Sequence, residues 1–192
     1  AVLDEGVITL AGVLGSFHVD LGLGEVRIAN AGGEVELSLR SGAVSVEDTD
    51  CGFLSVQCES GEVELTRVQS ERQHIELGSG LVSIEESTSA HTELALGYAE
   101  VRLVELEGEL TTQLDGGELE LIGGGPSTRR VNSNFAPLVV RGASGVLEVQ
   151  ATFGQVRVLG VDGELSAHSG YGPVEVEGRF DALDTKSGSG PM

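Results

Sequence analysis

Short stretches in which aliphatic residues occupy every second position recur along the whole chain. Each has the form Gly or Ala, any residue, aliphatic, any residue, aliphatic. The first copy begins at Gly6 (GVITL) and the tenth at Gly172 (GPVEV), and successive copies lie 18 or 19 residues apart. Alternation with a period of two is typical of a strand with one buried face. Ten copies in one frame indicate a repeat architecture.

Two aliphatic columns run through the ten copies. The third-position residues are Ile8, Val26, Val44, Val63, Val82, Val101, Leu119, Leu138, Val156 and Val174. The fifth-position residues are Leu10, Ile28, Val46, Leu65, Ile84, Leu103, Leu121, Val140, Val158 and Val176. Fourteen of these twenty residues are Val or Ile, which suit a pleated strand, so we expect both columns to face the interior.

A weaker copy of the phrase follows about nine residues after each first one, as in Gly15-Ser-Phe-His-Val and Gly33-Glu-Val-Glu-Leu. Each coil is therefore predicted to hold two strands of about five residues joined by turns, with the extra residue of the 19-residue coils absorbed in a turn. Strands that recur in register without an intervening helix predict an all-β fold. We expect a single right-handed parallel β-solenoid domain over residues 1–192, with about ten coils of 18–19 residues and a length of roughly 48 Å.

The charge balance and the distribution of apolar residues argue against several functions. Eleven basic residues face 31 acidic ones, a formal net charge of −20, which disfavours binding to nucleic acid. No apolar run approaches about 18 residues, so we expect no direct membrane insertion. The first residues do not combine a basic segment with an apolar stretch, so they do not indicate a signal peptide.

Three aromatic residues, Phe135, Phe153 and Tyr171, precede the small first residue in successive coils. Stacked aromatic side chains at this spacing would suit the binding of sugar rings. Strand alternation instead places this column inside. In other coils the large residue lies two positions earlier and the small one here, so the two positions together would keep the core filled. We favour the core interpretation over the sugar platform.

The polar residues suggest no site for chemistry, and we predict no catalytic, cofactor-binding or metal-ligating residue. Acidic residues such as Glu62 and Glu118 favour outward positions, but the paired glycines and Asp of calcium-binding nonapeptide repeats are missing. Some charge is neutralised locally, because Arg102 lies one coil from Glu120 and Arg157 one coil from Glu175. The four histidines, His18, His74, His91 and His168, are scattered and predict no metal cluster.

Two further features are interpreted structurally. Cys58 is expected to be buried and Cys51 to lie in a turn, with their bonding left open. Gly123-Gly124-Gly125-Pro126 lacks the Lys and the helix of a phosphate-binding loop. One member of the adjacent pair Arg129 and Arg130 should point inward by the repeat frame. We therefore expect a bulge or loop in that coil.

The tandem phrases GEVEL, GEVRI and GAVSV resemble those of a bacterial adhesin-type β-solenoid family, over almost the whole chain. The resemblance implies a two-strand-per-coil solenoid without enzymatic activity or cofactors. It also implies a role at the cell envelope or outside the cell, as a rigid acidic scaffold or binding surface for an unidentified protein or cell-surface partner. The family has no agreed site residues.

Two other functions compete with this interpretation. The first is a bactofilin-like cytoskeletal scaffold in the cytoplasm that polymerises end to end. Ala1 and Leu3 fall in the inward columns of an incomplete first coil, and an incomplete eleventh copy begins at Gly190, which is consistent with end-to-end self-association. The second is a polysaccharide-cleaving β-helix enzyme, which would need longer coils with loops that build a cleft.

Overall fold

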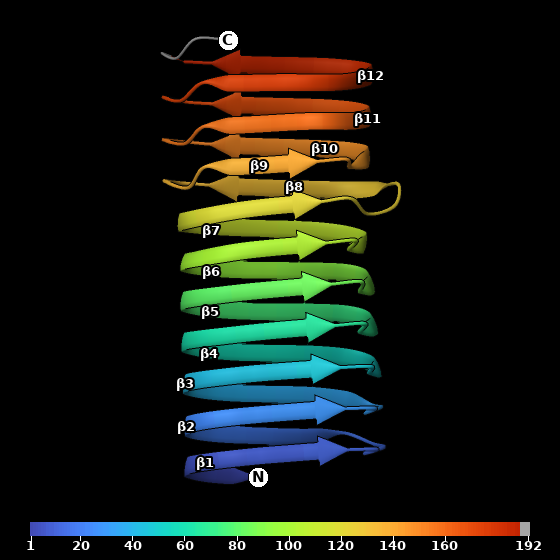
Figure 1. Ribbon diagram of the computed structural model, residues 1–192, viewed down its shortest axis with the longest axis vertical. Helices are drawn as coiled ribbons and strands as arrows, with labels where there is room; N and C mark the ends of the chain where they lie inside the picture. The colour runs from blue at the N-terminus through green and yellow to red at the C-terminus, as the bar shows by residue number, and fades with distance from the viewer. Residues whose placement is uncertain (189–192) are drawn as a thin grey trace.

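The computed structural model describes residues 1–188 as an elongated rod built from strands alone (Figure 1). All pairing between the named strands is parallel, which confirms the predicted all-β solenoid. The described residues form β1 (Val2–Ala11), β2 (Phe17–Ala29), β3 (Glu34–Glu47), β4 (Asp50–Thr66), β5 (Gln69–Glu85), β6 (Thr88–Val104), β7 (Glu107–Ile122), β8 (Ser127–Ser133), β9 (Leu138–Arg141), β10 (Ser144–Ala151), β11 (Val156–Ser169) and β12 (Val174–Ser187).

Each coil lies in register on the coil before it. Gly24 pairs with Gly6 below and with Gly42 above, and the aliphatic residue Val26 pairs with Val44. The chain climbs from the N-terminus, and the segments nearest the viewer rise toward the right in Figure 1, which is the path of a right-handed helix. The predicted frame and hand are therefore both present.

The two short strands predicted for each coil are not separate in the lower part of the rod. There, one long strand runs round an edge of the rod without a break, as β4 does over 17 residues. We call this the glycine edge, because Gly24, Gly42, Gly61 and Gly80 form its corner with φ between 135° and 147°. A Cβ atom on Gly42 would lie 1.8 Å from the carbonyl oxygen of Gly24, so only glycine fits there.

The opposite edge, which we call the turn edge, breaks the strands in the lower coils. Asn30, Asp48, Arg67, Glu86 and Glu105 occupy the same place in successive coils and all have φ between 48° and 53°. These residues adopt the left-handed conformation that reverses the chain. The extra residue of the first 19-residue coil lies in the turn here, since Asn30 and Asp48 are 18 apart whereas Val35 and its partner Leu54 are 19 apart.

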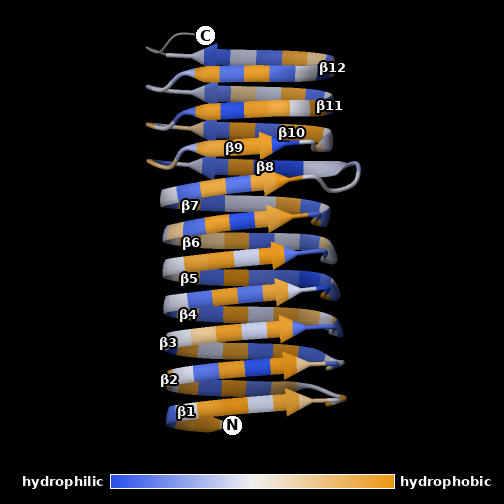
Figure 2. Ribbon diagram, viewed as in Figure 1, coloured by the Kyte–Doolittle hydropathy of each residue, from blue (hydrophilic) through white to orange (hydrophobic). Residues whose placement is uncertain are grey.

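The interior is filled by the predicted aliphatic columns. The third-position residues are all buried, and the fifth-position residues are buried except for Leu10 and Val176, which are half-buried at the two ends. Figure 2 shows hydrophobic residues alternating with hydrophilic ones at matching places in successive coils. Burial of these columns supplies the main stabilising free energy of the rod.

The rod changes construction between β7 and β9. From β8 onward the strands break at the glycine edge, and β11 instead runs without a break round the turn edge, past Gly160 and Gly163 (Figure 1). The change occurs at the loop over residues 123–126, where a loop or bulge was predicted. The truncated copy predicted at Gly190 lies outside the described residues.

Arg129 and Arg130 confirm the expectation that one of the pair points inward. Arg129 is 1% exposed, and its guanidinium group donates hydrogen bonds to the carbonyl oxygens of Ser144, Leu106 and Gly125 at 3.0, 3.2 and 2.8 Å. Burial lowers the pKa of Arg129. Arg130 points outward and contacts Glu148 at 2.9 Å. The buried side chain therefore ties the loop to the coils on both sides of it.

Candidate functional site

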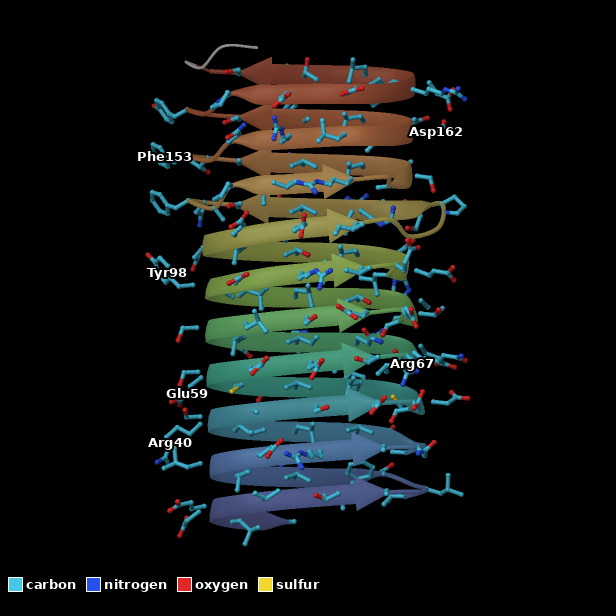
Figure 3. All side chains as sticks on the ribbon, viewed as in Figure 1. Arg40, Glu59, Arg67, Tyr98, Phe153 and Asp162 are labelled. Carbon is cyan, nitrogen blue, oxygen red and sulfur yellow. The ribbon has the colours of Figure 1, made fainter. Side chains whose placement is uncertain are left out.

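The most distinctive surface feature is a stack of three exposed aromatic rings, Phe135, Phe153 and Tyr171, which we call the aromatic ridge. These residues are 60, 50 and 65% exposed. The ring centroids lie 5.2 and 4.8 Å apart, with the planes within 4° and 7° of parallel. The prediction that these residues face the core is therefore wrong. Figure 3 shows Phe153 projecting from the edge of the rod on which Tyr98 also lies.

The rings point outward because strand alternation ends before the corner. In the lower coils the same position is also at the surface, as Leu23 and Tyr98 are 47% and 68% exposed. In the upper coils the inward position two residues earlier is small, and loop backbone fills the space. Ser133 accepts a hydrogen bond from the N–H group of Ala136 at 2.9 Å, and Ala136 is fully buried.

Hydrogen bonds between successive loops hold the ridge in place. The N–H group of Phe135 donates to the carbonyl oxygen of Asp115 at 3.0 Å, and that of Phe153 donates to Asn134 at 2.8 Å. In the third loop Ser169 accepts from the N–H group of Gly172 at 2.8 Å and donates to the carbonyl oxygen of Gly154 at 2.9 Å. The ridge is thus built on paired backbone, which orders it before any ligand arrives.

A shallow hollow of about 400 Å³ lies beside the ridge on the surface formed by β7, β8, β10 and β11. We call it the neutral hollow, because its lining contains no carboxylate and no Arg or Lys. The polar side chains that line it are Gln113, Asn132, Ser133, Asn134, Gln150, Thr152 and His168. Its volume falls in the range of ordinary ligand sites, though near the lower end.

Elsewhere the surface carries ion pairs, most of them between neighbouring coils. Arg157 contacts Glu175 at 2.7 Å, as predicted from the shared column, and this hydrogen bond lowers the pKa of Glu175. Arg102 lies in register with Glu120 as predicted, but its guanidinium group contacts Glu85 instead, at 3.2 Å. Such exposed pairs contribute little to stability.

The four histidines share one arrangement. Each imidazole lies 2.9–3.4 Å from a carboxylate of the next coil, in the pairs His18–Glu36, His74–Glu93, His91–Glu109 and His168–Asp184. His18 and His74 occupy one outward column but lie three coils apart. Because all four histidines are paired in this way, the contact between His168 and Asp184 does not single out a catalytic pair.

Cysteine and metal chemistry give no second site in residues 1–188. Cys51 and Cys58 are both buried free thiols, and burial raises the pKa of Cys51 to about 11. Cys58 fits the predicted buried position, whereas Cys51 is a buried strand residue of β4 rather than a turn residue. The described residues contain no group of three or more His, Cys, Asp or Glu side chains that could hold a metal ion. They also contain no helix of the length and hydropathy required to cross a membrane.

Comparison with known proteins supports the repeat architecture. The model of one protein family, Toastrack DUF4097, matches residues 11–190 and therefore nearly the whole chain. The chain belongs to the Toastrack DUF4097 family. No curated protein and no solved structure matched it. The family match supports the solenoid, and the resemblances to bacterial adhesins and to bactofilins stay predictions.

Within this Toastrack chain, sequence reasoning missed the two features that make the candidate site. It noted the spacing of the aromatic ridge but placed the rings inside. It did not single out the planar polar side chains at Gln113, Asn132 and Gln150, which lie one coil apart in one outward column. Their spacings of 19 and 18 residues carry that signal and could have been found with the repeat frame.

Proposed function

We propose that this Toastrack chain is a non-enzymatic, adhesin-like binding module of the bacterial cell envelope. The observation that carries the proposal is the aromatic ridge. Three large aromatic side chains, each at least half exposed and ordered by backbone hydrogen bonds, lie in a row on a chain of net charge −20. Clustered exposed apolar side chains mark interaction surfaces more often than scattered ones do.

The distribution of shifted pKa values supports a role without catalysis. Among the described residues, the carboxylates with a lowered pKa are Asp48, Glu175 and Asp184, each hydrogen-bonded to a basic side chain at the surface. The thiols with a raised pKa are buried. Catalytic sites gather shifted groups in a cleft. None of these residues lines the neutral hollow, and Asp48, Asp184 and Cys58 are spread over three other hollows.

The architecture also suits display of a surface. Each coil contacts the coils above and below it through a continuous ladder of backbone pairing, so a feature repeated in successive coils keeps a fixed spacing along the rod. The assignment to the envelope rests on the resemblance to adhesin-type solenoids alone. The bactofilin-like alternative stays a prediction, because end-to-end association requires a partner at the ends of the rod rather than on its side.

Co-sedimentation with insoluble bacterial envelope material tests the proposal. The purified chain should sediment with the envelope fraction in a saturable way. The variant in which Phe135, Phe153 and Tyr171 are all replaced by Ser should remain in the supernatant. Leu14→Ser is the matched control. Leu14 is 86% exposed, but it lies in the loop between β1 and β2, away from the ridge. Equal sedimentation of the triple variant and the wild-type chain would refute the proposal.

A further inference from the structure

The neutral hollow differs in charge from the other hollows on the rod. The four others described on residues 1–188 are each lined by at least two carboxylates, such as Asp20 and Glu59 in one and Asp48 and Glu86 in another. Two carboxylates contact residues of the neutral hollow without lining it themselves. Asp115 accepts a hydrogen bond from Asn134 at 2.8 Å, and Asp184 contacts His168. The lining of the neutral hollow therefore neither attracts nor repels a charged ligand through a direct ionic contact. In particular, no carboxylate lines it that would attract a cation.

Four planar polar side chains line the neutral hollow in a single column along the rod. Gln113 pairs in register with Asn132, Asn132 with Gln150, and Gln150 with His168. Their spacing is thus that of paired strands, about 4.8 Å. Within residues 1–188, no hydrogen bond to another protein group occupies the side-chain amides of Gln113, Asn132 and Gln150. Each amide offers both donors and an acceptor to a ligand.

The aromatic ridge begins where the lining of the hollow ends, because Asn134 and Thr152 line the hollow and Phe135 and Phe153 follow them in the chain. Phe135, Phe153 and Tyr171 each follow, by three residues, a member of the column: Asn132, Gln150 and His168. Because the rings stack closely on one another, their faces are largely covered and their edges face solvent. The ridge therefore offers an apolar wall along which a ligand lies, rather than separate platforms between which it inserts.

The repeat selects a linear ligand with a matching period. An extended peptide advances about 3.3 Å per residue and falls out of step with coils about 4.8 Å apart. A hexopyranose unit in an extended polysaccharide is close in length to the distance between neighbouring coils along the rod. Its hydroxyl groups donate and accept hydrogen bonds as the amides require, and its C–H surfaces suit an apolar wall. The net charge of −20 disfavours a polyanionic chain.

We propose that the neutral hollow and the aromatic ridge together bind a neutral polysaccharide laid along the rod axis. The coils that carry Gln113, Asn132, Gln150 and His168 would each contact about one sugar unit. This inference rests on the proposed function, since it names the class of ligand that the binding module recognises. The amides supply direction through hydrogen bonds, and the ridge supplies apolar contact.

Calorimetric titration with neutral oligosaccharides tests the inference. The probes are linear oligomers of glucose, mannose, xylose and N-acetylglucosamine, from disaccharide to hexasaccharide, with heparin as an anionic comparison. At least one neutral series should bind, and its affinity should increase up to about four units and then level off, because four coils line the hollow. Heparin should not bind.

Two variants locate the site. The double variant Asn132→Ala/Gln150→Ala should weaken binding of the same hexasaccharide by about tenfold. Gln57→Ala is the matched control, because Gln57 is an exposed amide of the same outward column but lies in a different hollow, and it should leave binding unchanged. Equal weakening by Gln57→Ala would overturn the assignment to the neutral hollow.

The outcomes separate this inference from the proposed function. If no neutral oligosaccharide binds but the chain still sediments with envelope material through the ridge, the polysaccharide assignment is wrong and the binding module stands. If heparin alone binds, a neutral ligand is excluded. If light scattering instead shows a dimer that Phe153→Ser abolishes, the ridge joins two copies of this chain and the inference is wrong.

Discussion

Gln73 and Thr92 are register partners in β5 and β6, and both side chains lie inside the rod with no hydrogen-bond partner among residues 1–188. Gln73 is fully buried and Thr92 is 2% exposed. They occupy a column that otherwise holds Leu54 below and Leu110 above. An amide buried without a partner loses its bonds to water and gains nothing in return, so this position reduces stability.

Replacement of Gln73 by Leu should therefore stabilise the rod. Leu matches Leu54 in the same column and removes two unsatisfied polar atoms, so the free energy of unfolding should rise by about 1–3 kcal/mol. Urea denaturation followed by circular dichroism measures the change. Gln69→Leu, at an exposed amide where β5 begins, should have an effect near zero. A destabilised Gln73→Leu variant would mean that ordered water already satisfies the amide.

The turn edge offers a second way to stabilise the chain. Glu86 has φ of 50°, and a non-glycine residue in this conformation costs about 1–2 kcal/mol. Glycine removes that cost but loses about 0.4–1 kcal/mol through the greater freedom of the unfolded chain. Glu86→Gly should therefore raise the free energy of unfolding by roughly 0.5–1 kcal/mol, measured by urea denaturation.

Gly142→Ala provides the opposite test at the same edge. Gly142 has φ of 65°, and a Cβ atom there would meet no atom closer than 3.9 Å, so only the backbone conformation is changed. The variant should be destabilised by roughly the same amount by which Glu86→Gly is stabilised. Changes of the same sign in both variants would contradict this account of the turn edge.

The ion pair between Arg157 and Glu175 should give a pH-dependent contribution. Its hydrogen bond lowers the pKa of Glu175 below the ordinary value of 4.5. A carboxylate with a lowered pKa stabilises the folded state above its unfolded pKa, and this contribution is lost as pH falls through the folded pKa. The Tm difference between the wild-type chain and Arg157→Gln should be constant above about pH 5.5 and shrink toward zero below about pH 4.

The comparison must be made between variants, because protonation also reduces the repulsion within a chain of net charge −20. Repulsion affects both proteins alike and cancels in the difference. Arg72→Gln is the control, since Arg72 is exposed and forms no ion pair within the described residues. A Tm difference for Arg157→Gln that is the same at every pH would show that the pair does not shift the titration of Glu175.

The buried thiols should be protected from alkylation in the folded protein. Burial raises the pKa of Cys51 from 9.0 to about 11 and also raises the pKa of Cys58, so little thiolate forms at pH 8. Iodoacetamide should label neither cysteine within minutes in native buffer and both in urea, as counted by mass spectrometry. Because the folded pKa is the higher one, stability should fall as pH rises from about 9 to 11. Prompt labelling of the native chain would contradict the burial of both residues.

The sequence contained most of the fold because each coil repeats the same pattern. Val44, Val63 and Val82 lie where the alternation placed them, since the register of parallel strands carries one correct position to all others. Arg129 could be expected inside from the same frame. Its three carbonyl partners could not, because they depend on how the loop over residues 123–126 folds back.

The candidate site was misjudged for a local reason. Alternation describes a residue only while the chain stays in a strand, and Phe153 lies just beyond the end of β10. Alternation also fails at Tyr98, although β6 runs round the corner there without a break. The backbone bends at this residue, and its side chain is left at the surface. Neither the exposure of the ridge nor the hollow beside it follows from the spacing of the repeats.

The glycine edge also constrains how such a rod can change length over evolutionary time. At Gly42, Gly61 and Gly80 the space of a missing side chain is taken by the carbonyl oxygen of the glycine one coil below. If a duplicated segment spans one whole coil, it contains one corner glycine, and that glycine lies against the carbonyl oxygen of the corner glycine below it as before. A duplication of any other length places a larger residue against that oxygen. Descendants of this chain should therefore gain or lose length in steps of one coil, 18 or 19 residues at a time.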